Sequence, residues 1–314
     1  MRVAILGASG HIAKNITSKM FYHTQYELCL FSRSPNQVKL FDDQLRVAER
    51  VKVLPYEHFK LHEYDVVING VGIGDPGALK QQLSMILRLT EAYDNLILDY
   101  LLTYPETLYI NLSSGAAYGS SFNKPAGLET RSDYAIDLIT NNEYYSIAKF
   151  YSEVKHRSLS HLNIIDLRIF GFFSKYIDLN SHFLLSEIVR TIRSNGVFVT
   201  NDVNFVRDYA HPADLFQLIE LCIQRKGVNK AYDVYSRAPV TKFELLYALE
   251  QRFKLKYQIY EQEGEVSVTG IKSNYYSQNL SAQELGYAPR YTSFEGIQEV
   301  ITSIIDEADN HEEN

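Results

Sequence analysis

The sequence has no excess of positive charge and no long apolar run. Its 314 residues include 31 lysines and arginines against 38 aspartates and glutamates, which gives a net charge of −7. No basic cluster offsets this balance, so we expect no nucleic-acid partner. The apolar stretches are too short, and too interrupted by charges, to cross a bilayer, so we expect no membrane partner either.

Cysteine is also scarce. The two cysteines, Cys29 and Cys222, lie far apart in a predicted strand and a predicted helix. Two isolated core thiols indicate a reducing compartment rather than a disulfide framework. The opening residues, "MRVAILGASG", predict a strand rather than a secretory signal. We therefore expect a cytoplasmic protein.

A metal centre is not indicated. His58 and His62 have an i, i+4 spacing that could hold a metal ion, but no H-E-x-x-H motif and no third ligand accompany them. A solvated helical face explains the pair better, and we expect no metal.

Short apolar, β-branched runs alternate with helical patterns in the first half of the chain. Such runs suit strands that are buried on both faces of a parallel sheet. Strands are predicted over residues 2–6, 26–31, 51–54, 65–69, 108–113 and 163–170, and helices over 11–22, 36–49, 78–103 and 143–161. This alternation predicts an α/β fold with a Rossmann-type doubly wound parallel sheet. Ligands bind such sheets at the carboxyl ends of the strands.

The pattern is less regular after residue 170. Helices are predicted over residues 183–194 and 211–224 and from about residue 292, and strands over 197–200 and 231–236. The chain is longer than a usual single core. We therefore expect a dinucleotide-binding domain over residues 1–170, to which residues 210–236 return. A smaller, mixed α/β substrate-binding subdomain would take up most of residues 171–314 and interleave with it.

"ILGASGHIA" places Gly7, Gly10 and Ala13 directly after the first strand, at the start of a helix. Glycine allows the tight turn and the close approach of backbone N–H groups to a pyrophosphate, and the helix N-terminus adds partial positive charge. The spacing is looser than G-x-G-x-x-G, and Ala13 still permits close helix–strand packing. The cofactor-binding residues predicted in this turn are Gly7, Ser9, Gly10, His11 and Ile12.

The end of the second predicted strand, "LFSRSP", bears on the choice of cofactor. NAD binders place an acidic residue there to hold the ribose 2′-hydroxyl, whereas this chain has Ser32 followed by Arg33. An arginine suits a 2′-phosphate, so we favour NADP(H) over NAD(H). The glycine-rich segment 68–77, "INGVGIGDPG", adds Gly70 and Val71 as predicted cofactor contacts.

"YSIAK" sets Tyr145 one helical turn before Lys149. A tyrosine that acts as a base near neutral pH needs its phenolate stabilised by ~4 kcal/mol, and a nearby ammonium group is a plausible source. "NLSSGAAYG", at the end of the fifth predicted strand, supplies a hydroxyl that could hold a carbonyl oxygen.

Taken together, these motifs resemble the extended short-chain dehydrogenase/reductase superfamily, in its nucleotide-sugar-modifying NAD(P)-dependent epimerase/dehydratase branch. The matching segments are GASGHIA at 7–13, SSGAAYG at 113–119, YSIAK at 145–149, LRIF at 167–170 and RDYAHPADL at 207–215. The resemblance implies that Tyr145 exchanges a proton with the substrate. Lys149 would stabilise the phenolate and hold the nicotinamide ribose, and Ser114 would orient the substrate oxygen.

The resemblance also implies the substrate contacts and the assembly. Arg207 matches an arginine that contacts the diphosphate of a nucleotide sugar, although a pair with Asp208 is an alternative. His182 falls where some relatives place a substrate-facing histidine. The helices predicted over 78–103 and 143–161 match those that form an intersubunit four-helix bundle, so we expect a homodimer.

The residues after Ser114 narrow the choice of reaction within this family. Dehydratases of this family carry an Asp-Glu pair there, and 3,5-epimerases carry a cysteine at the second position, whereas this chain has Gly115 and Ala116. Reduction of a 4-keto sugar nucleotide by NADP(H) is the favoured reaction. The alternatives are 4-epimerisation with a retained NAD(P) and a non-catalytic NADP(H)-sensing or scaffold protein.

Overall fold

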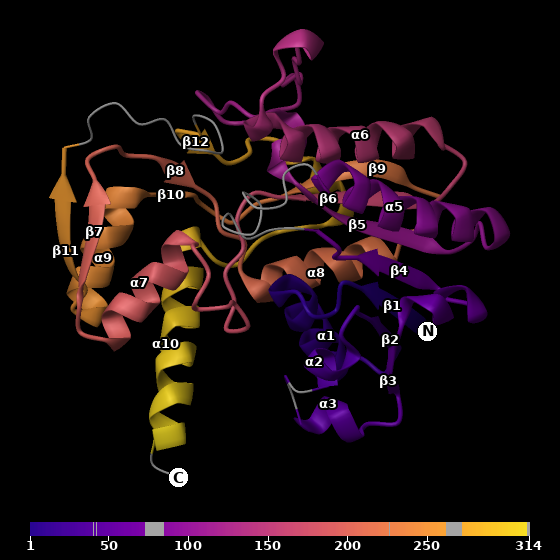
Figure 1. Ribbon diagram of the computed structural model, residues 1–314, viewed down its shortest axis with the longest axis horizontal. Helices are drawn as coiled ribbons and strands as arrows, with labels where there is room; N and C mark the ends of the chain where they lie inside the picture. The colour runs from indigo at the N-terminus through magenta and orange to yellow at the C-terminus, as the bar shows by residue number, and fades with distance from the viewer. Residues whose placement is uncertain (40, 42, 73–84, 226, 262–271, 313–314) are drawn as a thin grey trace.

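The computed structural model describes residues 1–39, 41, 43–72, 85–225, 227–261 and 272–312, and a seven-stranded sheet forms its centre (Figure 1). Every pair of neighbouring strands in it is parallel. In spatial order the strands are β3 (Val51–Leu54), β2 (Glu27–Phe31), β1 (Arg2–Leu6), β4 (Val66–Asn69), β5 (Leu108–Ser114), β6 (Ile164–Ile169) and β9 (Asn229–Val234). The predicted α/β fold with a Rossmann-type parallel sheet is thereby confirmed.

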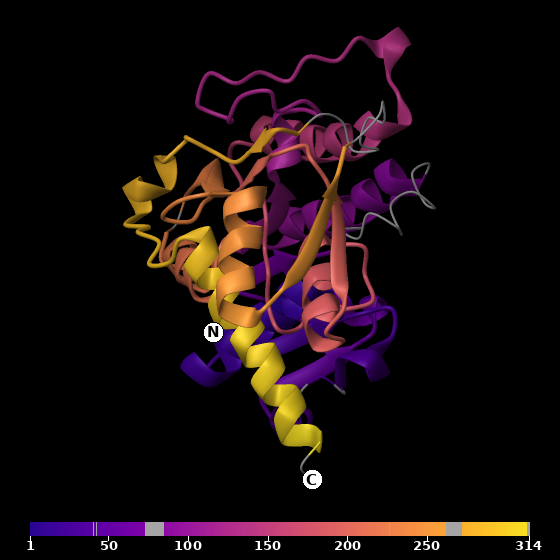
Figure 2. The ribbon, with the colours of Figure 1, turned by 90° about the vertical axis from the view of Figure 1, so that its left-hand side faces the viewer.

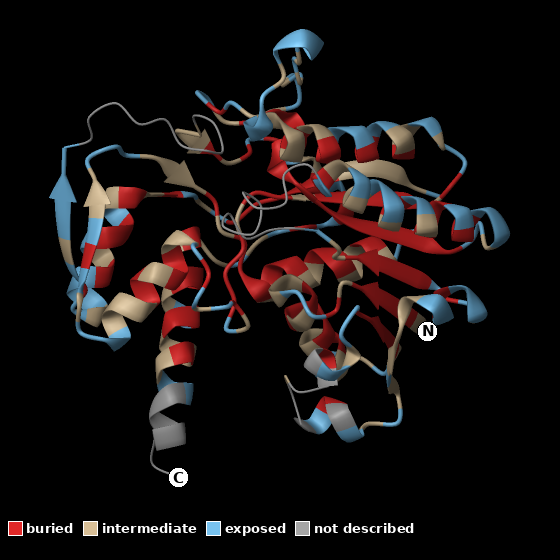
Figure 3. Ribbon diagram, in the orientation of Figure 1, coloured by how far each residue is buried: buried red, intermediate tan, exposed pale blue. Residues whose placement is uncertain are grey.

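Helices cover both faces of this sheet. On one face α5 (Ile86–Thr103) packs beside α6 (Tyr144–Ser158), and on the other α1 (His11–His23) packs beside α8 (Pro212–Ile223) (Figure 1). The central strands are buried almost completely because both faces are covered (Figure 3). All seven residues of β5 are buried. This explains why the strands read as continuous apolar runs.

The predicted helix over residues 36–49 is wrong in one respect, because the structure has two short helices there. These are α2 (Pro35–Lys39) and α3 (Asp43–Val47). Val38, Phe41 and Leu45 keep the apolar spacing that produced the prediction, but the backbone bends at Phe41. No glycine or proline marks this bend in the sequence. For the helix predicted over 78–103, the structure describes only residues 85–103, and residues 78–84 lie outside the described part.

The second half of the chain adds a smaller lobe with its own apolar core (Figure 2). Its strands form two small sheets: β8 (Val206–Arg207), β10 (Val240–Thr241) and β12 (Asn274–Tyr275) in one, and β7 (Val197–Asn201) and β11 (Lys256–Tyr260) in the other. Its helices are α7 (Leu184–Arg193), α9 (Lys242–Phe253) and α10 (Ser293–Glu312). By contrast, β9 pairs with β6 at the edge of the main sheet, so the chain enters the smaller lobe after β6, returns to the main sheet through α8 and β9, and enters the lobe again at β10.

Short 3-10 segments complete the fold: η1 (Tyr56–Leu61), η3 (Gly115–Tyr118), η4 (Ile136–Leu138), η5 (Asn141–Glu143) and η6 (Ser281–Leu285). Two of them position the site described below. Segment η3 turns the chain sharply after β5, and η1 follows β3 at the carboxyl edge of the sheet.

Candidate active site

The turn between β1 and α1 needs glycine at its first position. Gly7 has a φ of 73°, and a Cβ built there would lie 2.7 Å from the carbonyl carbon and oxygen of Gly70. Gly10 closes the turn by donating its N–H to the Gly7 carbonyl at 2.9 Å. Helix α1 begins at the next residue with no side-chain cap. Its first N–H groups are therefore suited to bind an anion.

A cavity of about 350 Å³ lies at the carboxyl ends of β4, β5 and β6. Its lining brings together segments that are distant in the sequence: 10–13, 70–72, 112–114, Tyr145, Lys149, 169–172, Phe183, Lys272 and Tyr275. The predicted catalytic residues Ser114, Tyr145 and Lys149 thus share one cavity with the start of α1. Among the predicted cofactor contacts, Gly10, His11, Ile12, Gly70 and Val71 line it as well.

Lys149 is held by the main chain of the sheet. Its Nζ donates a hydrogen bond to the Leu112 carbonyl at 3.2 Å and lies 6.0 Å from the centroid of the Tyr145 ring. The side chain is only 7% exposed. Helix α6 places both residues on the face that meets the end of β5, as the four-residue spacing predicts.

The two serines at the end of β5 have different partners. Ser113 Oγ donates to Glu153 Oε1 at 2.7 Å, and Glu153 is also paired with Arg168 at 2.6 Å. Ser114 Oγ instead lies 2.9 Å from Tyr275 Oη and accepts a hydrogen bond from the Ala116 N–H at 3.2 Å. The hydroxyl of Ser113 is thus committed to a buried ion pair, which supports Ser114 as the substrate-facing hydroxyl.

Gly115 is pressed against an aromatic ring. A Cβ at this position would lie 2.5 Å from two ring carbons of Phe170. Ala116 and Ala117 in the same turn are also buried. An acidic pair after Ser114 would therefore require Phe170 to move.

Arg207 is half-buried and has no carboxylate partner among the described residues. It donates to the carbonyl groups of Val206 and Lys272, and its guanidinium stacks 4.3 Å from the Phe205 ring centroid. Burial lowers the pKa of Arg207. The suggested pair with Asp208 does not form, because that carboxylate accepts hydrogen bonds from Ser236 and Ser293 instead.

Lys272 lies beside Arg207 and lines the cavity, although no sequence motif predicts a role for it. Its Nζ lies 4.6 Å from the centroid of the Tyr275 ring. Burial, together with the Arg207 charge, lowers the pKa of Lys272 to about 8. The two cations form a positive region next to the cavity.

The end of β2 lies outside this cavity lining. Ser32 is buried and its Oγ accepts a hydrogen bond from the Ser34 N–H at 3.2 Å, whereas Arg33 is exposed. Tyr56 of η1 reaches the turn between β1 and α1 and accepts a hydrogen bond from the Gly7 N–H at 3.1 Å. No sequence motif predicts this contact. Ser9 is exposed on the turn itself.

The two predicted site histidines differ in placement. His11 packs against the rings of Phe172 and Phe183, at centroid distances of 5.6 and 6.4 Å. Burial lowers the pKa of His11 to about 4, so its ring is neutral at physiological pH, and its Nε2 has no partner in the described structure. His182 is exposed and does not line the cavity, although the next residue, Phe183, does.

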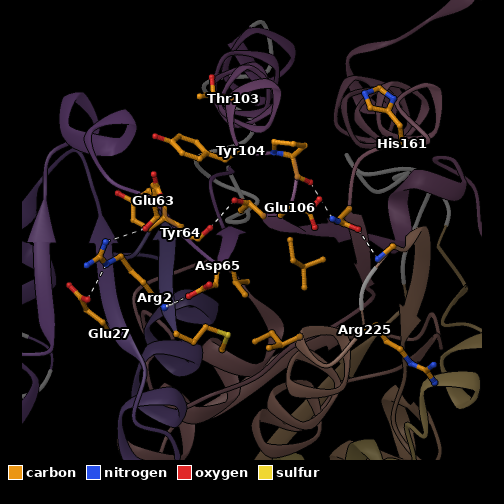
Figure 4. Close-up of a pocket in the computed structure, with 18 of the residues that line it drawn as sticks. Arg2, Glu27, Glu63, Tyr64, Asp65, Thr103, Tyr104, Glu106, His161 and Arg225 are labelled. Atoms are coloured by element: carbon orange, nitrogen blue, oxygen red, sulfur yellow. Dashed lines mark hydrogen bonds and ion pairs between the residues drawn. The ribbon is translucent and has the colours of Figure 1, made fainter.

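A second and larger cavity, of about 1290 Å³, lies at the opposite edge of the sheet (Figure 4). It surrounds the amino ends of the strands, and some of its charged groups pair with one another. Arg2 Nε contacts Glu27 Oε2 at 3.0 Å, and the Arg2 N–H donates to Asp65 Oδ2 at 2.6 Å. No predicted site residue lines this cavity, so the candidate chemistry lies at the carboxyl edge alone.

The described residues lack two further kinds of feature. They contain no cluster of three histidine, cysteine, aspartate or glutamate side chains arranged to hold a metal ion. None of the described helices combines the length and the apolar character that spanning a bilayer requires.

The fold and the site together define a Rossmann-type protein with a glycine turn, a serine and a Tyr-Lys pair around one cavity. Residues 3–236 match the NAD dependent epimerase/dehydratase family, and the chain belongs to it. The predicted relationship to the extended short-chain dehydrogenase/reductase superfamily is thereby confirmed, and so is its enzyme class.

Solved structures of similar fold cover almost the whole chain. They include a dTDP-glucose 4,6-dehydratase from Bacillus anthracis in complex with NAD, with 16% identity, a TM-score of 0.78 and 98% coverage of both chains. A UDP-glucose 4-epimerase from Thermotoga maritima with UDP-glucose has 16% identity, a TM-score of 0.78 and coverage of 98% of this chain and 99% of its own. A UDP-glucuronic acid 4-epimerase from Bacillus cereus, in complex with UDP-glucuronic acid and NAD, has 13% identity, a TM-score of 0.77 and coverage of 98% and 100%. No curated protein matches the chain by sequence.

Proposed function

We propose that this enzyme reduces the 4-keto group of a nucleotide-linked sugar, with NADP(H) as cofactor. The observation that carries this proposal is the shared cavity of Ser114, Tyr145 and Lys149 beside the start of α1. The bound dinucleotide would supply the hydride. Tyr145 would donate its proton to the carbonyl oxygen, Ser114 would donate a hydrogen bond to the same oxygen, and Lys149 would stabilise the phenolate that remains.

The residues of the turn fit a dinucleotide. Gly7 has no Cβ and so lets the backbone of Gly70 approach the turn closely, and the first N–H groups of α1 have no side-chain cap. We propose Gly7, Ser9, Gly10, His11 and Ile12 as pyrophosphate-side contacts. Lys149 would hold the nicotinamide ribose, with Gly70 and Val71 beside the dinucleotide.

The preference for NADP(H) is supported by the absence of a carboxylate at Ser32 and by the exposed Arg33 next to it. A guanidinium can bind a 2′-phosphate with charge-assisted hydrogen bonds. Ser32→Asp tests this preference, since a carboxylate would repel the phosphate and accept a hydrogen bond from a 2′-hydroxyl. We expect tighter NADH binding and weaker NADPH binding in a calorimetric titration. An unchanged ratio of the two affinities would contradict the assignment.

For the substrate we propose a nucleotide diphosphate group held by Arg207, with Lys272 as a second cation. The half-buried guanidinium lacks a carboxylate partner in the described residues, and its charge would be balanced by a diphosphate. His182 stays a predicted substrate contact from outside the cavity lining. By this proposal residues 1–170 and 210–236 bind the dinucleotide, and most of the remaining second half binds the sugar nucleotide.

The competing proposal is 4-epimerisation with a retained NAD(P). It is favoured by the fold similarity to two 4-epimerases. Gly115 packed under Phe170 disfavours dehydration, because that position has no room for an acid without movement of the ring. Steady-state assays separate the two reactions, since a reductase consumes NADPH stoichiometrically and an epimerase shows no net change in the cofactor.

The alternative that the protein is a non-catalytic NADP(H) sensor or scaffold can be tested with Tyr145→Phe. The variant keeps the ring and removes the transferable proton, so an enzyme should lose roughly 10²- to 10⁴-fold in turnover and still bind NADPH. The matched control is Tyr144→Phe, on the neighbouring position of α6, outside the cavity lining. Equal activity of the two variants would contradict a catalytic role for Tyr145.

We also propose that the protein forms a homodimer through α5 and α6. Ile147, Phe150, Tyr151 and Val154 recur on one face of α6 with helical spacing, and the last three are 38%, 45% and 47% exposed. An apolar stripe of this kind on an outer helix is typical of a subunit contact. Tyr151→Glu should shift the mass found by analytical ultracentrifugation from dimer to monomer, and an unchanged mass would contradict this interface.

A further inference from the structure

The hydroxyl of Ser114 already has a phenol as a neighbour. Tyr275 Oη lies 2.9 Å from Ser114 Oγ, although 161 residues separate the two in the sequence. Tyr275 belongs to β12, which pairs with β8 in the smaller lobe. The second half of the chain therefore reaches directly to the end of β5.

The surroundings fix the position of the Tyr275 ring. Phe122 contacts it edge-on at a centroid distance of 4.7 Å, and Phe170 lies 5.1 Å away. The ring is buried, and burial raises the pKa of Tyr275. Its hydroxyl therefore keeps its proton at physiological pH and can donate a hydrogen bond.

Three hydrogen-bond donors meet at the end of β5. Ser114 and Tyr275 each bring one O–H, and the Ala116 N–H donates to Ser114 Oγ at 3.2 Å. The hydrogen bond between the two hydroxyl groups uses one of their two protons. Among the described residues, Ser114 Oγ is the only acceptor within hydrogen-bond distance of Tyr275 Oη. When Tyr275 donates to Ser114, the Ser114 proton has no acceptor in the protein and is free for a ligand oxygen.

We propose that Tyr275 is a positioning residue that makes Ser114 a donor toward the reacting oxygen. This inference rests on the proposed carbonyl chemistry of the site. With the Tyr275 O–H and the Ala116 N–H both directed at Ser114 Oγ, the serine hydroxyl can only donate. A chain of donors strengthens each hydrogen bond within it, so the pair stabilises the negative charge that develops on a carbonyl oxygen as it is reduced.

The test compares Tyr275→Phe with the wild type, using NADPH and 4-keto sugar nucleotides of dTDP, UDP, GDP and CDP. If the wild type epimerises instead, UDP-glucose and UDP-glucuronic acid serve as substrates, because that reaction also passes through a ketone. Phenylalanine keeps the ring in its aromatic cluster and removes only the hydroxyl. We expect kcat to fall by roughly 10- to 100-fold with KM changed by less than about threefold. The control is Tyr276→Phe, the adjacent tyrosine, which does not line the cavity and should keep full activity.

A double-mutant cycle separates positioning from a structural effect. In a Ser114→Ala background the Tyr275 hydroxyl has nothing to orient, so Tyr275→Phe should cause no further loss of kcat. If the losses of kcat in Ser114→Ala and Tyr275→Phe multiply in the double variant, the proposal is overturned. It is also overturned if the wild type is active and Tyr275→Phe alone leaves kcat unchanged. A wild type that turns over none of these substrates, with either reaction assayed, would overturn the proposed function and this role with it.

Discussion

The ammonium group of Lys149 donates a hydrogen bond to the carbonyl oxygen of Leu112, and the same carbonyl belongs to the strand that carries Ser114. One strand end therefore positions two of the three proposed catalytic groups. The contact fixes the ammonium group about one helical turn from Tyr145 without neutralising its charge. A neutral carbonyl partner leaves that charge available to a phenolate and to a ribose hydroxyl.

The first prediction follows from this contact. Lys149→Met keeps the length of the side chain and removes the charge, so kcat should fall by roughly 10²-fold or more and the Kd for NADPH should rise. Stopped-flow turnover and fluorescence titration measure the two effects. Lys60→Met, at an exposed surface lysine, is the control and should leave both values unchanged. Equal loss in both variants would argue against a site role for Lys149.

The second prediction concerns the glycine turn. Gly7→Ala forces a Cβ into the Gly70 carbonyl and strains a positive φ, so we expect a loss of about 1–3 kcal/mol in the free energy of unfolding and much weaker NADPH binding. The matched control is Gly127→Ala, where an added Cβ meets no atom within 4 Å. Chemical denaturation and a thermal-shift titration with NADPH provide the measurements. Normal cofactor binding by the Gly7 variant would contradict the assigned turn.

The third prediction concerns His156, a buried histidine of α6 that contacts α5 and β6. His156 lies between Asp94 and Asp166, at 2.8 and 2.9 Å, and is not exposed. Burial alone would lower the pKa of His156, but the two carboxylates outweigh it and raise this pKa to about 9, above its ordinary value of 6.5. His156→Gln would remove one cation from these carboxylates, which keep Lys155 and Arg157 as partners, and we expect a loss of about 1–3 kcal/mol in the free energy of unfolding at pH 7.

The contribution of His156 to the free energy of unfolding should depend on pH with a definite sign. Because the folded-state pKa is raised, the stability that His156 contributes is complete below pH 6.5 and is lost as pH rises toward and beyond 9. The difference in unfolding free energy between wild type and His156→Gln should therefore shrink from pH 6 to pH 9.5. Urea denaturation at several pH values measures it. A difference that is constant or grows with pH would contradict the charged state of His156.

The fourth prediction uses Lys272. Because its pKa is lowered to about 8, its charge is lost as pH rises through that value, and binding of a nucleoside diphosphate should weaken. Isothermal titration with UDP and dTDP at pH 7 and pH 9 measures the change. Lys272→Met should bind more weakly at pH 7 and show a smaller change with pH. If Lys272→Met binds the nucleoside diphosphate as tightly as the wild type at pH 7, Lys272 is not part of the proposed diphosphate site.

The sequence alone determined the features that depend on neighbours along the chain. The glycine turn could be predicted because a positive φ and a close backbone approach at Gly7 leave no other residue type. The Tyr145–Lys149 register follows from helical spacing, and the buried parallel strands follow from continuous apolar runs. These local signals were enough to predict the family and the sheet.

The tertiary structure decided what depends on distant segments. No local pattern connects Tyr275 or Lys272 with Ser114. The contact exists because the smaller lobe packs against the sheet and places β12 at the end of β5. The different partners of Ser113 and Ser114 and the bend at Phe41 likewise depend on packing. Side-chain partners across a cavity are selected by shape and burial in three dimensions, and neither leaves a periodic signal in the sequence.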